Sequence, residues 1–447
     1  MEEKETQSFL QKGMDNLKQS VSLKLFVITV LALLLLIPTS MVESLIEERE
    51  ANRDFAIQEV SEKWGSEQVL SGPFLSIPYK KLHQSKEGVT TYSVHYAHFL
   101  PESLVVNSKV DPITRKRGIY EVVLYNGALD VAGHFKKPDF KIWNIDPELI
   151  LWEDATLSIG ISDLTGIQER IRIKWNERVL PISPGLVNHQ VTSSGVSTRV
   201  PIADAGVYNF GFKLSLNGST RLGITPIGKE TKIAMKSPWP NPSFNGRFLP
   251  DNHDINESGF SANWTVLDLN RNYPQQWLAS NQKIDESVFG VDFILPVDEY
   301  QKNMRSAKYA ALIIALTFLI FFLVEVLNQK RFHPIQYALV GLVITIFYAL
   351  LLSITEHLGF QLAYLIAASM TVSLILTYIS SIFKSTRLSI ITGIALSGIY
   401  FFIYVILQLQ DFSLLVGSLG LFIALGTLMF LSRKVNWYNI NPQTEAA

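Results

Sequence analysis

The segment Gly223-Ile-Thr-Pro-Ile-Gly228-Lys229-Glu230 comes close to the sequence of a phosphate-binding loop. Such a loop needs Ser or Thr after its lysine to bind magnesium, and a following helix whose N-terminus points at the phosphate. Here Glu230 occupies the hydroxyl position and would repel phosphate, and the strand-like segment Lys232-Ile-Ala-Met235 follows. We interpret the segment as a turn between strands and expect that Gly228 and Lys229 bind no nucleotide.

His95 and His98 lie three residues apart in a strand-like segment. Side chains three apart on a strand point to opposite faces, so we expect them not to share a metal ion and to be half-buried or exposed. The chain has no cysteine, no His-Glu-x-x-His and no Gly-x-Ser-x-Gly. Thiolate, zinc-protease and hydrolase chemistry therefore lack their usual residues, and we predict no enzyme activity, no cofactor and no metal site.

The stretch from Pro238 to Pro250, Pro-Trp-Pro-Asn-Pro-Ser-Phe-Asn-Gly-Arg-Phe-Leu-Pro, combines four prolines with three aromatic residues. It could be an exposed recognition loop. It could equally fold as a rigid loop over the core of its domain.

Glu325 is the one charged residue in the apolar run Tyr309–Leu327. A carboxylate inside a membrane helix is a candidate functional residue because burying its charge is costly. The alternative is that Glu325, near the end of the run, reaches Lys330 or Arg331 at the membrane surface. No further acidic residue lies at mid-depth in the predicted helices, which disfavours a proton-coupled transporter.

Six apolar runs indicate a membrane protein. The 447 residues are 48% hydrophobic, and the net charge of -1 gives no argument for nucleic-acid binding. The first run, Leu25–Met41, follows a long leader and precedes a poor cleavage site, so we interpret it as an uncleaved anchor rather than a signal peptide. Five further runs have about the length of 20 residues that is needed to cross a bilayer. They are Tyr309–Leu327, Ile335–Ile354, Phe360–Phe383, Leu388–Leu407 and Ser413–Leu431.

Between the first two runs the sequence changes character. Residues 42–64 keep a helical pattern with many charges, which predicts a stalk continuing the first membrane helix. Residues 65–297 contain short β-branched and aromatic segments with period two, such as Thr91–Tyr96 and Phe210–Leu216, separated by Gly, Pro, Asn and Asp. We predict a large all-β, sandwich-like domain inserted after the first helix.

The charges of the connectors predict the orientation. Basic residues cluster on the side of the N-terminal tail, and they are Lys330, Arg331, Lys384, Arg387, Arg433 and Lys434. The opposite connectors carry Glu356, His357 and Asp411. Because Lys and Arg concentrate on the cytoplasmic side, we expect cytoplasmic termini and an extracytoplasmic β domain.

Several segments, in their order along the chain, resemble the inner-membrane CreD family, also called cell envelope integrity proteins. They are Ser71–Pro78, Leu100–Leu104, Arg115–Tyr120, Trp239–Phe244, Phe248–Pro250, Ser258–Trp264, Tyr300, Lys308–Ala310, Leu316–Phe318, Glu325, His333–Tyr337 and Glu356–His357. The resemblance covers nearly the whole chain. It implies an inner-membrane protein tied to envelope stress and to regulation by a two-component system, and it supplies no catalytic residues.

These observations predict a division of the chain into a cytoplasmic tail (1–24), a transmembrane helix (25–41), a stalk (42–64), a periplasmic β domain (65–297), a connector (298–308), a bundle of helices two to six (309–431) and a cytoplasmic tail (432–447). We expect a non-enzymatic inner-membrane protein of envelope integrity or stress response. Besides the lipid bilayer it would bind an unknown periplasmic or membrane component, such as a protein partner. The alternative is a transporter or channel subunit with a periplasmic β domain.

Arg305 and Lys308 precede the second run, on the expected periplasmic side and against the charge trend. At the N-terminus of a helix the macrodipole disfavours each cation by about 0.3–1 kcal/mol. Lipid phosphates could offset this, or a carboxylate of Asp298, Glu299 or Glu356. A pair between Lys308 and Glu356 would join the second and third membrane helices.

The orientation predicts the activity of reporter fusions. A reporter that works only in the cytoplasm should be active after Lys330 or Ala447 and silent at Gly127 in the β domain. Activity at Gly127 would reverse the assigned orientation.

Overall fold

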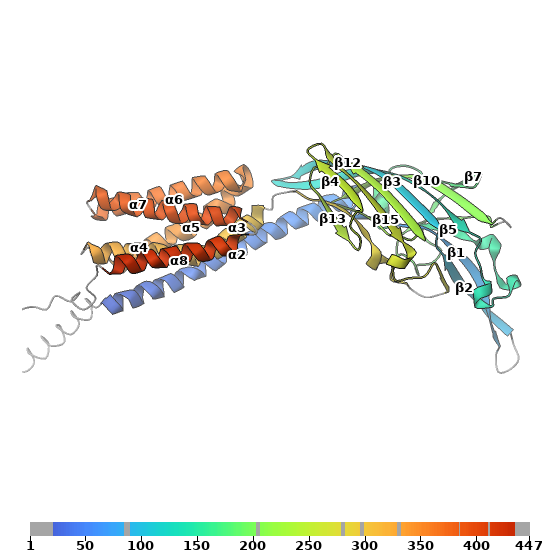
Figure 1. Ribbon diagram of the computed structural model, residues 1–447, viewed down its shortest axis with the longest axis horizontal. Helices are drawn as coiled ribbons and strands as arrows, with labels where there is room; N and C mark the ends of the chain where they lie inside the picture. The colour runs from blue at the N-terminus through green and yellow to red at the C-terminus, as the bar shows by residue number, and fades with distance from the viewer. Residues whose placement is uncertain are drawn as a thin grey trace, which may run out of the picture. The chain divides into compact units, whose positions relative to one another are not determined.

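The computed structural model describes residues 21–84, 90–202, 206–278, 282–295, 299–328, 332–383, 385–409 and 412–433. The chain forms two compact units (Figure 1). We call Met1–Asn52 with Val297–Ala447 the membrane unit, and Arg53–Pro296 the β domain.

Helices occur in the order α2 (Val21–Trp64), α3 (Glu299–Lys308), α4 (Ala310–Leu327), α5 (Pro334–Leu358), α6 (Phe360–Phe383), α7 (Thr386–Gln408) and α8 (Ser413–Ser432). The strands lie between α2 and α3: β1 (Gln68–Gln84), β2 (Thr90–Phe99), β3 (Ser103–Arg117), β4 (Tyr120–Lys136), β5 (Thr156–Ile161), β6 (Arg172–Trp175), β7 (Arg178–Pro181), β8 (Ser183–Pro184), β9 (Gly195–Arg199), β10 (Val207–Ser219), β11 (Arg221–Ile224), β12 (Glu230–Ser237), β13 (Pro242–Gly246), β14 (Asn252–Asn256), β15 (Gly259–Leu267), β16 (Gln276–Leu278) and β17 (Phe289–Phe293).

Within the described residues, six helices are long and apolar enough to cross a membrane, namely α2 and α4 to α8. Five of them follow the β strands along the chain, and α2 precedes them. The predicted fold class is therefore confirmed.

α2 is a single helix of 44 residues that contains both the predicted first membrane span and the predicted stalk. Pro38 lies inside it and cannot donate a backbone hydrogen bond. The hydroxyl of Thr39, the next residue, donates to the Leu35 carbonyl at 2.9 Å. Side-chain hydroxyls of this kind help to satisfy backbone groups near a proline inside lipid.

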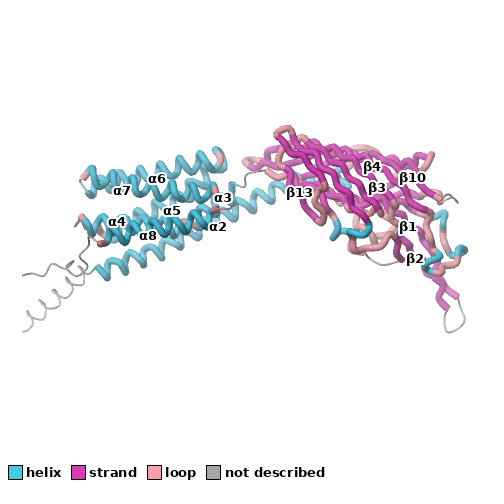
Figure 2. Tube along the Cα trace, in the orientation of Figure 1, coloured by secondary structure: helices cyan, strands magenta, loops and turns pink. Residues whose placement is uncertain are grey.

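The β domain contains two sheets (Figure 2). The nine-stranded sheet has the order β13-β17-β11-β1-β5-β9-β8, with β2 paired to β1 and β16 paired to β2. The eight-stranded sheet has the order β14-β15-β12-β3-β4-β10-β6-β7. Most neighbours are antiparallel, but β1 with β11 and β3 with β12 are parallel.

One continuous core joins the inner faces of both sheets. β12 alternates buried and more exposed positions along its length, as expected for a strand with one face on the core. Trp175, Trp264 and Tyr125 are among its largest fully buried side chains, and burying such a side chain stabilises a fold by roughly 1.5–3 kcal/mol. Gly133 marks a close approach, because a Cβ there would lie 2.0 Å from the Ser103 carbonyl oxygen.

The β3–β4 hairpin contacts the C-terminal end of α2 within the β domain. Trp64 Nε1 donates to the Tyr125 carbonyl at 3.4 Å, and the Arg115 guanidinium lies 5.1 Å from the Trp64 ring. Arg117 pairs with Glu59 at 3.2 Å. These contacts fix the last two turns of α2 on the domain that it enters.

The proline-rich stretch from Pro238 to Pro250 folds over the core. Trp239, Phe244 and Phe248 pack against it. Trp239 Nε1 donates to the Ile294 carbonyl at 3.2 Å, next to the exit from β17. The structure therefore favours the rigid-loop interpretation over an exposed recognition loop.

His98 is fully buried, contrary to the expectation of a half-buried or exposed side chain. Its Nδ1 lies 3.0 Å from Ser76 Oγ, and its Nε2 lies 2.9 Å from Gln190 Oε1, which can only accept. Burial lowers the pKa of His98, although the Gln190 contact partly opposes the shift. His95, by contrast, is half-buried and contacts Ser93.

We expect the fragment Arg53–Pro296 to fold alone and to lose stability as the pH falls below about 6.5, the ordinary pKa of histidine. Below that pH the unfolded chain binds a proton that folded His98 does not, so unfolding is favoured. His98→Gln should flatten this part of the pH profile in thermal melts followed by circular dichroism.

His253→Gln, at an exposed position of β14, is the matched control and should leave the profile unchanged. A mainly helical spectrum of the fragment, or the same pH profile for His98→Gln as for the unsubstituted fragment, would contradict the expectation.

Candidate functional site

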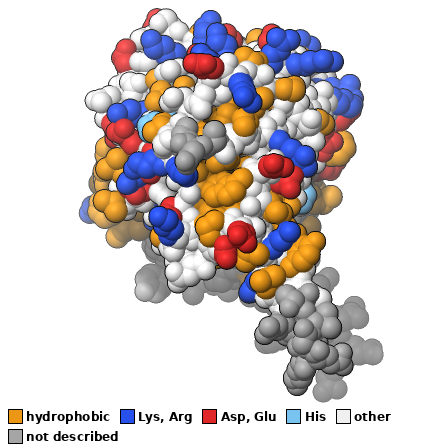
Figure 3. Space-filling model, turned by 90° about the vertical axis from the view of Figure 1, so that its right-hand side faces the viewer, with side chains coloured by type: hydrophobic (Ala, Val, Ile, Leu, Met, Phe, Trp, Pro, Cys, Tyr) orange, Lys and Arg blue, Asp and Glu red, His pale blue; other side chains and the backbone are white. Residues whose placement is uncertain are grey.

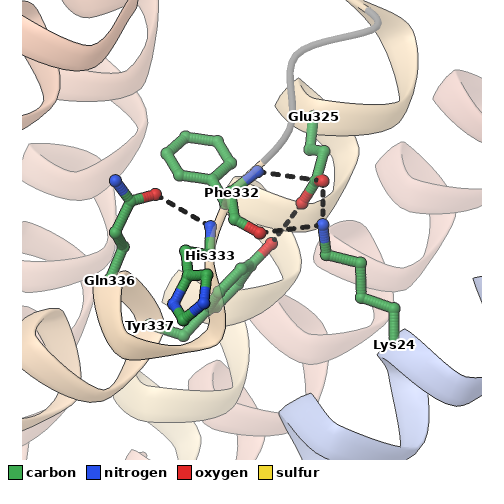
Figure 4. Close-up of polar contacts among 6 residues, drawn as sticks. All are labelled: Lys24, Glu325, Phe332, His333, Gln336 and Tyr337. Atoms are coloured by element: carbon green, nitrogen blue, oxygen red, sulfur yellow. Dashed lines mark hydrogen bonds and ion pairs between the residues drawn. The ribbon is translucent and has the colours of Figure 1, made fainter. Parts of the chain in front are cut away.

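The carboxylate of Glu325 is 6% exposed and has polar partners from three segments (Figure 4). Lys24 of α2 forms an ion pair with Oε1. The backbone N–H of Phe332 donates to Oε1 at 3.1 Å, and the hydroxyl of Tyr337 donates to Oε2 at 3.0 Å. Lys24 also donates to the Phe332 carbonyl at 3.1 Å. Both oxygens of the carboxylate therefore have partners.

The start of α5 positions two of these partners. Pro334 occupies the first turn, where its missing N–H costs nothing, and His333 with Gln336 forms a capping box. Tyr337 follows one turn into the helix. Its ring centroid lies 5.4 Å from that of Phe318 and 5.9 Å from that of Phe332. These three rings form one aromatic cluster, and the Tyr337 hydroxyl connects the cluster to the carboxylate.

Sequence reasoning identified Glu325 but missed its cation. Lys24 was assigned to the N-terminal tail, and the alternative partners Lys330 and Arg331 lie outside the described residues. A usable signal existed, because Lys24 directly precedes the first apolar run and Glu325 lies near the end of the second. In a chain that crosses the membrane and returns, those two positions lie on the same side.

A second polar cluster lies where α5 ends. The Tyr300 hydroxyl of α3 donates to Glu356 Oε1 at 3.1 Å, and Arg49 Nε of α2 lies 3.9 Å from the same oxygen. Glu299 Oε2 accepts from the backbone N–H of Phe360, the first residue of α6, at 2.6 Å. Glu356 and Glu299 thus join α2, α3, α5 and α6.

The proposed pair between Lys308 and Glu356 is wrong. Lys308 is exposed and the two described side chains form no ion pair; Arg49 and Tyr300 contact Glu356 instead. The physical reason is that residues 299–308 form the helix α3 rather than a plain connector. Its buried face contains Tyr300 and Ala307, and Lys308 lies off that face.

The expected dipole penalty for Arg305 and Lys308 also disappears. Tyr309, at φ -87° and ψ 2°, separates α3 from α4, so both cations lie in the last turn of α3. Cations are favoured at a helix C-terminus. Arg305 in addition donates to the carbonyl of Leu409, just after α7, at 3.4 Å.

The outer face of the eight-stranded sheet carries a groove of about 1070 Å³. Lys236 of β12 and Lys109 of β3 lie directly opposite each other in neighbouring strands. In the next outward-facing row, Asp130 of β4 lies between Asn107 of β3 and Lys213 of β10. Small side chains separate the charges, and they are Ala128, Ser215, Ala234 and Ser261. The groove is thus shallow, with apolar surface between charged groups of both signs, and these are Lys109, Lys213, Lys236, Asp111, Asp130, Glu169 and Asp254.

The paired lysines are not equally neutralised. Lys109 lies 3.4 Å from Asp111, whereas no described acidic side chain lies within ion-pair distance of Lys236. Like charges directly opposite each other on neighbouring strands are destabilising. An anion placed over the two lysines would remove that repulsion.

The segment that resembles a phosphate-binding loop is a turn, as predicted. A strand, β12, follows it in place of a helix. The backbone N–H groups of Gly228, Lys229 and Glu230 donate to Thr231 Oγ1, the Pro101 carbonyl and the Glu102 carbonyl, at 2.8–3.0 Å. None of these three donors is available to a phosphate.

Comparison with known proteins decides the family. The sequence model of the family described as inner membrane protein CreD matches residues 20–438. The chain is also 32% identical over 423 residues to inner membrane protein CreD of Escherichia coli (strain K12), with 93% of each chain covered. The chain belongs to the CreD family.

As a CreD-family chain, it is a multi-pass protein of the inner membrane. The match to the CreD model includes Lys24, Glu325, Glu356 and the groove of the β domain. The features described above therefore lie within the part of the chain that defines the family, and not in an added segment.

Removing one partner of the Lys24–Glu325 pair should leave a buried charge uncompensated. We expect Lys24→Met and Glu325→Gln each to destabilise the purified protein by roughly 1–3 kcal/mol, measured by thermal unfolding in detergent. The double variant should be no less stable than the less stable single variant.

Lys63→Met is the control on the same helix, because Lys63 forms an exposed pair with Glu59 at 2.7 Å. Exposed pairs of this kind contribute little, so its effect should be small. Strictly additive losses for Lys24 and Glu325 would show that the two side chains do not stabilise each other.

Proposed function

We propose that this CreD-family chain is a non-enzymatic protein of envelope integrity or envelope stress response. It acts by binding an envelope component at the groove of its β domain. Both termini are cytoplasmic in this proposal, and the β domain is periplasmic.

Basic residues at three helix ends support the orientation. Arg387 lies in the first turn of α7, and Arg433 follows α8. Lys24 pairs with Glu325 near the end of α4. Since Lys and Arg concentrate on the cytoplasmic side of inner-membrane proteins, these helix ends face the cytoplasm and the β domain faces the periplasm.

The observation that supports binding is the lysine pair in the groove. Lys109 and Lys236 project from adjacent strands on the outer face, and both are exposed. Folding brings these like charges together although they are far apart in sequence. A surface selected for stability alone would avoid such a pair, whereas an anionic ligand would be held by both ammonium groups.

The other lining groups indicate the class of ligand. Amide and hydroxyl groups come from Asn107, Ser215 and Ser261. Carboxylates that can accept from ammonium groups come from Asp111, Asp130, Glu169 and Asp254. The rest of the lining surface is largely apolar, and Phe260 is its aromatic ring. Sugar hydroxyls, carboxylates and ammonium groups match the polar and charged groups of this surface. A cell-wall glycopeptide carries all three.

Transport, the alternative function, would need a polar path that reaches Glu325. Its carboxylate instead accepts from Lys24, Phe332 and Tyr337, and the Tyr337 ring packs against Phe318. This arrangement supports a structural role for Glu325, and we do not propose transport.

Substituting the lysine pair should weaken binding of soluble anionic peptidoglycan fragments to the full-length protein in lipid nanodiscs. We expect Lys236→Ala and Lys109→Ala each to lower the affinity at least three-fold in titration calorimetry. Added salt should weaken binding of the unsubstituted protein, because screening acts on exposed charges.

Lys232→Ala is the matched control. Lys232 is exposed on the same strand, outside the groove lining, and pairs with Glu230 at 3.0 Å. It should leave the affinity unchanged. Equal affinities for Lys236→Ala and the unsubstituted protein, or binding that goes only to vesicles of anionic lipid, would contradict the proposed ligand class.

A further inference from the structure

A two-stranded ribbon extends from the nine-stranded sheet (Figures 1 and 2). β1 pairs with β5 only as far as Ser76, and an isolated bridge joins Tyr79 to Ile150. β2 pairs with β16 only from Ala97 to Phe99. Lys80–Gln84 and Thr90–Val94 therefore pair with each other alone in the described part of the chain.

The outer edge of β2 presents unpaired backbone groups. The N–H of Leu100 donates to the Gln275 carbonyl on the β16 side. Along a strand, alternate residues direct their N–H and C=O to the same edge, so Val94 and Tyr92 direct theirs to the edge that β16 occupies further along. No described residue pairs with Tyr92 or Val94 at that edge.

This edge lacks the usual protection. Natural edge strands carry charged residues, proline or a bulge that prevents pairing with another chain. Residues 90–96 contain no Lys, Arg, Asp, Glu or Pro, and the register with β1 is continuous. The opposite strand of the ribbon, β1, carries Lys80 and Lys81, and the Lys80 ammonium lies 4.9 Å from the centre of the Tyr92 ring. The ribbon therefore has charged residues on β1 that disfavour pairing with another chain, whereas β2 has none between residues 90 and 96.

Exposed apolar side chains alone would not support an interface. Figure 3 shows apolar side chains among lysine, arginine and acidic side chains on one face of the β domain, as on most protein surfaces. What distinguishes β2 is that Tyr92 and Val94, 60% and 47% exposed, coincide with the unpaired backbone groups.

We propose that β2 pairs antiparallel with β2 of a second copy of this chain, about a two-fold axis through Ser93. In this register Tyr92 lies opposite Val94 of the copy, and Val94 lies opposite its Tyr92. Aromatic and β-branched side chains directly opposite each other stabilise a sheet. The pairing joins two ribbons into a four-stranded sheet and goes beyond ligand binding at the groove.

The neighbouring strand β16 selects this register. Pairing centred on Ser93 spans Thr90 to Tyr96 and stops before Ala97, which already pairs with Leu278. Shifting the axis to Val94 would place Thr91 of the copy on Ala97. Shifting it to Tyr92 would lose the Tyr–Val pairs. A copy fits better than an unrelated peptide because the strand is complementary to itself and carries no charge to repel its twin.

The chain has no cysteine, so single cysteines can report the pairing. At the axis, Ser93 faces Ser93 of the copy as a non-hydrogen-bonded pair, with Cα atoms about 4.5 Å apart. That spacing lies within the range of disulfides. Ser93→Cys in the full-length protein in native membranes should form a disulfide-linked dimer on mild oxidation, at least ten-fold faster than Lys81→Cys.

Lys81→Cys is the matched control, because Lys81 lies directly opposite Ser93 on β1. In the four-stranded sheet the two copies of Lys81 are about 14 Å apart, three strand spacings, which no disulfide spans. Thr91→Cys mixed with His95→Cys should crosslink as a heteropair, whereas neither should crosslink with itself.

Val94→Pro in the Ser93→Cys background removes a donor from the open edge without removing a bond to β1. It should abolish the crosslink and leave the strand-type circular dichroism unchanged. Equal rates for Ser93→Cys and Lys81→Cys, no dimer, or crosslinking of Ser93→Cys to a different protein would overturn the proposal. Groove binding would be unaffected by any of these outcomes, because the lysine pair lies on the other sheet.

Discussion

The buried carboxylate of Glu325 joins α2, α4 and the start of α5 within the membrane unit. An uncompensated charge in lipid is costly, so the end of α4, the start of α5 and Lys24 of α2 must all be in place for it to be satisfied. α2 is held again at Arg49, beside Glu356. The 25 residues from Lys24 to Arg49 span about 37 Å of helix, slightly more than a hydrocarbon core of about 30 Å. The two ion pairs therefore suit the two faces of the membrane, where charged groups are least costly.

The short helix α3 provides hydrogen-bond partners for the unpaired backbone groups at the ends of neighbouring membrane helices. The first N–H groups and last C=O groups of any helix lack partners within the helix. Glu299 accepts from the N–H of Phe360 at the start of α6, and Arg305 donates to the carbonyl of Leu409 after α7. Each charge has the sign that the helix end favours. The same ten residues would carry a dipole penalty if they simply began the second membrane helix, which is why the break at Tyr309 matters.

Local signals in the sequence predicted which elements form, and they could not predict which elements meet. Apolar runs and period-two segments gave the six helices and the all-β region, because burial follows directly from residue type. The partner of Glu325 was missed because Lys24 is 301 residues away in sequence. The groove was missed for the same reason: Lys109 and Lys236 meet only through the parallel pairing of β3 with β12. In the sequence His98 looks like an ordinary polar strand residue. Its burial is possible because Ser76 and Gln190 form hydrogen bonds with its two ring nitrogens, and neither partner lies near it in the sequence. α3 was taken for a connector because its ten residues are mostly polar and lack the apolar run that marked the other helices.

The two proposed contacts of the β domain use different physics and can reinforce each other. The groove would recognise charge and hydroxyl groups through side chains of the eight-stranded sheet, and the β2 edge would recognise an extended backbone beside the nine-stranded sheet. Because they lie on different sheets, one can be occupied without closing the other. A dimer formed through β2 would carry two grooves. For a polymeric ligand the second groove would bind at the effective concentration set by the first, which raises avidity without any new contact, provided that the spacing of the grooves matches the ligand. Weak binding by a single shallow groove would then suffice for firm attachment to a cell-wall polymer, whereas a small soluble fragment of the same chemistry would bind with the lower affinity of one groove.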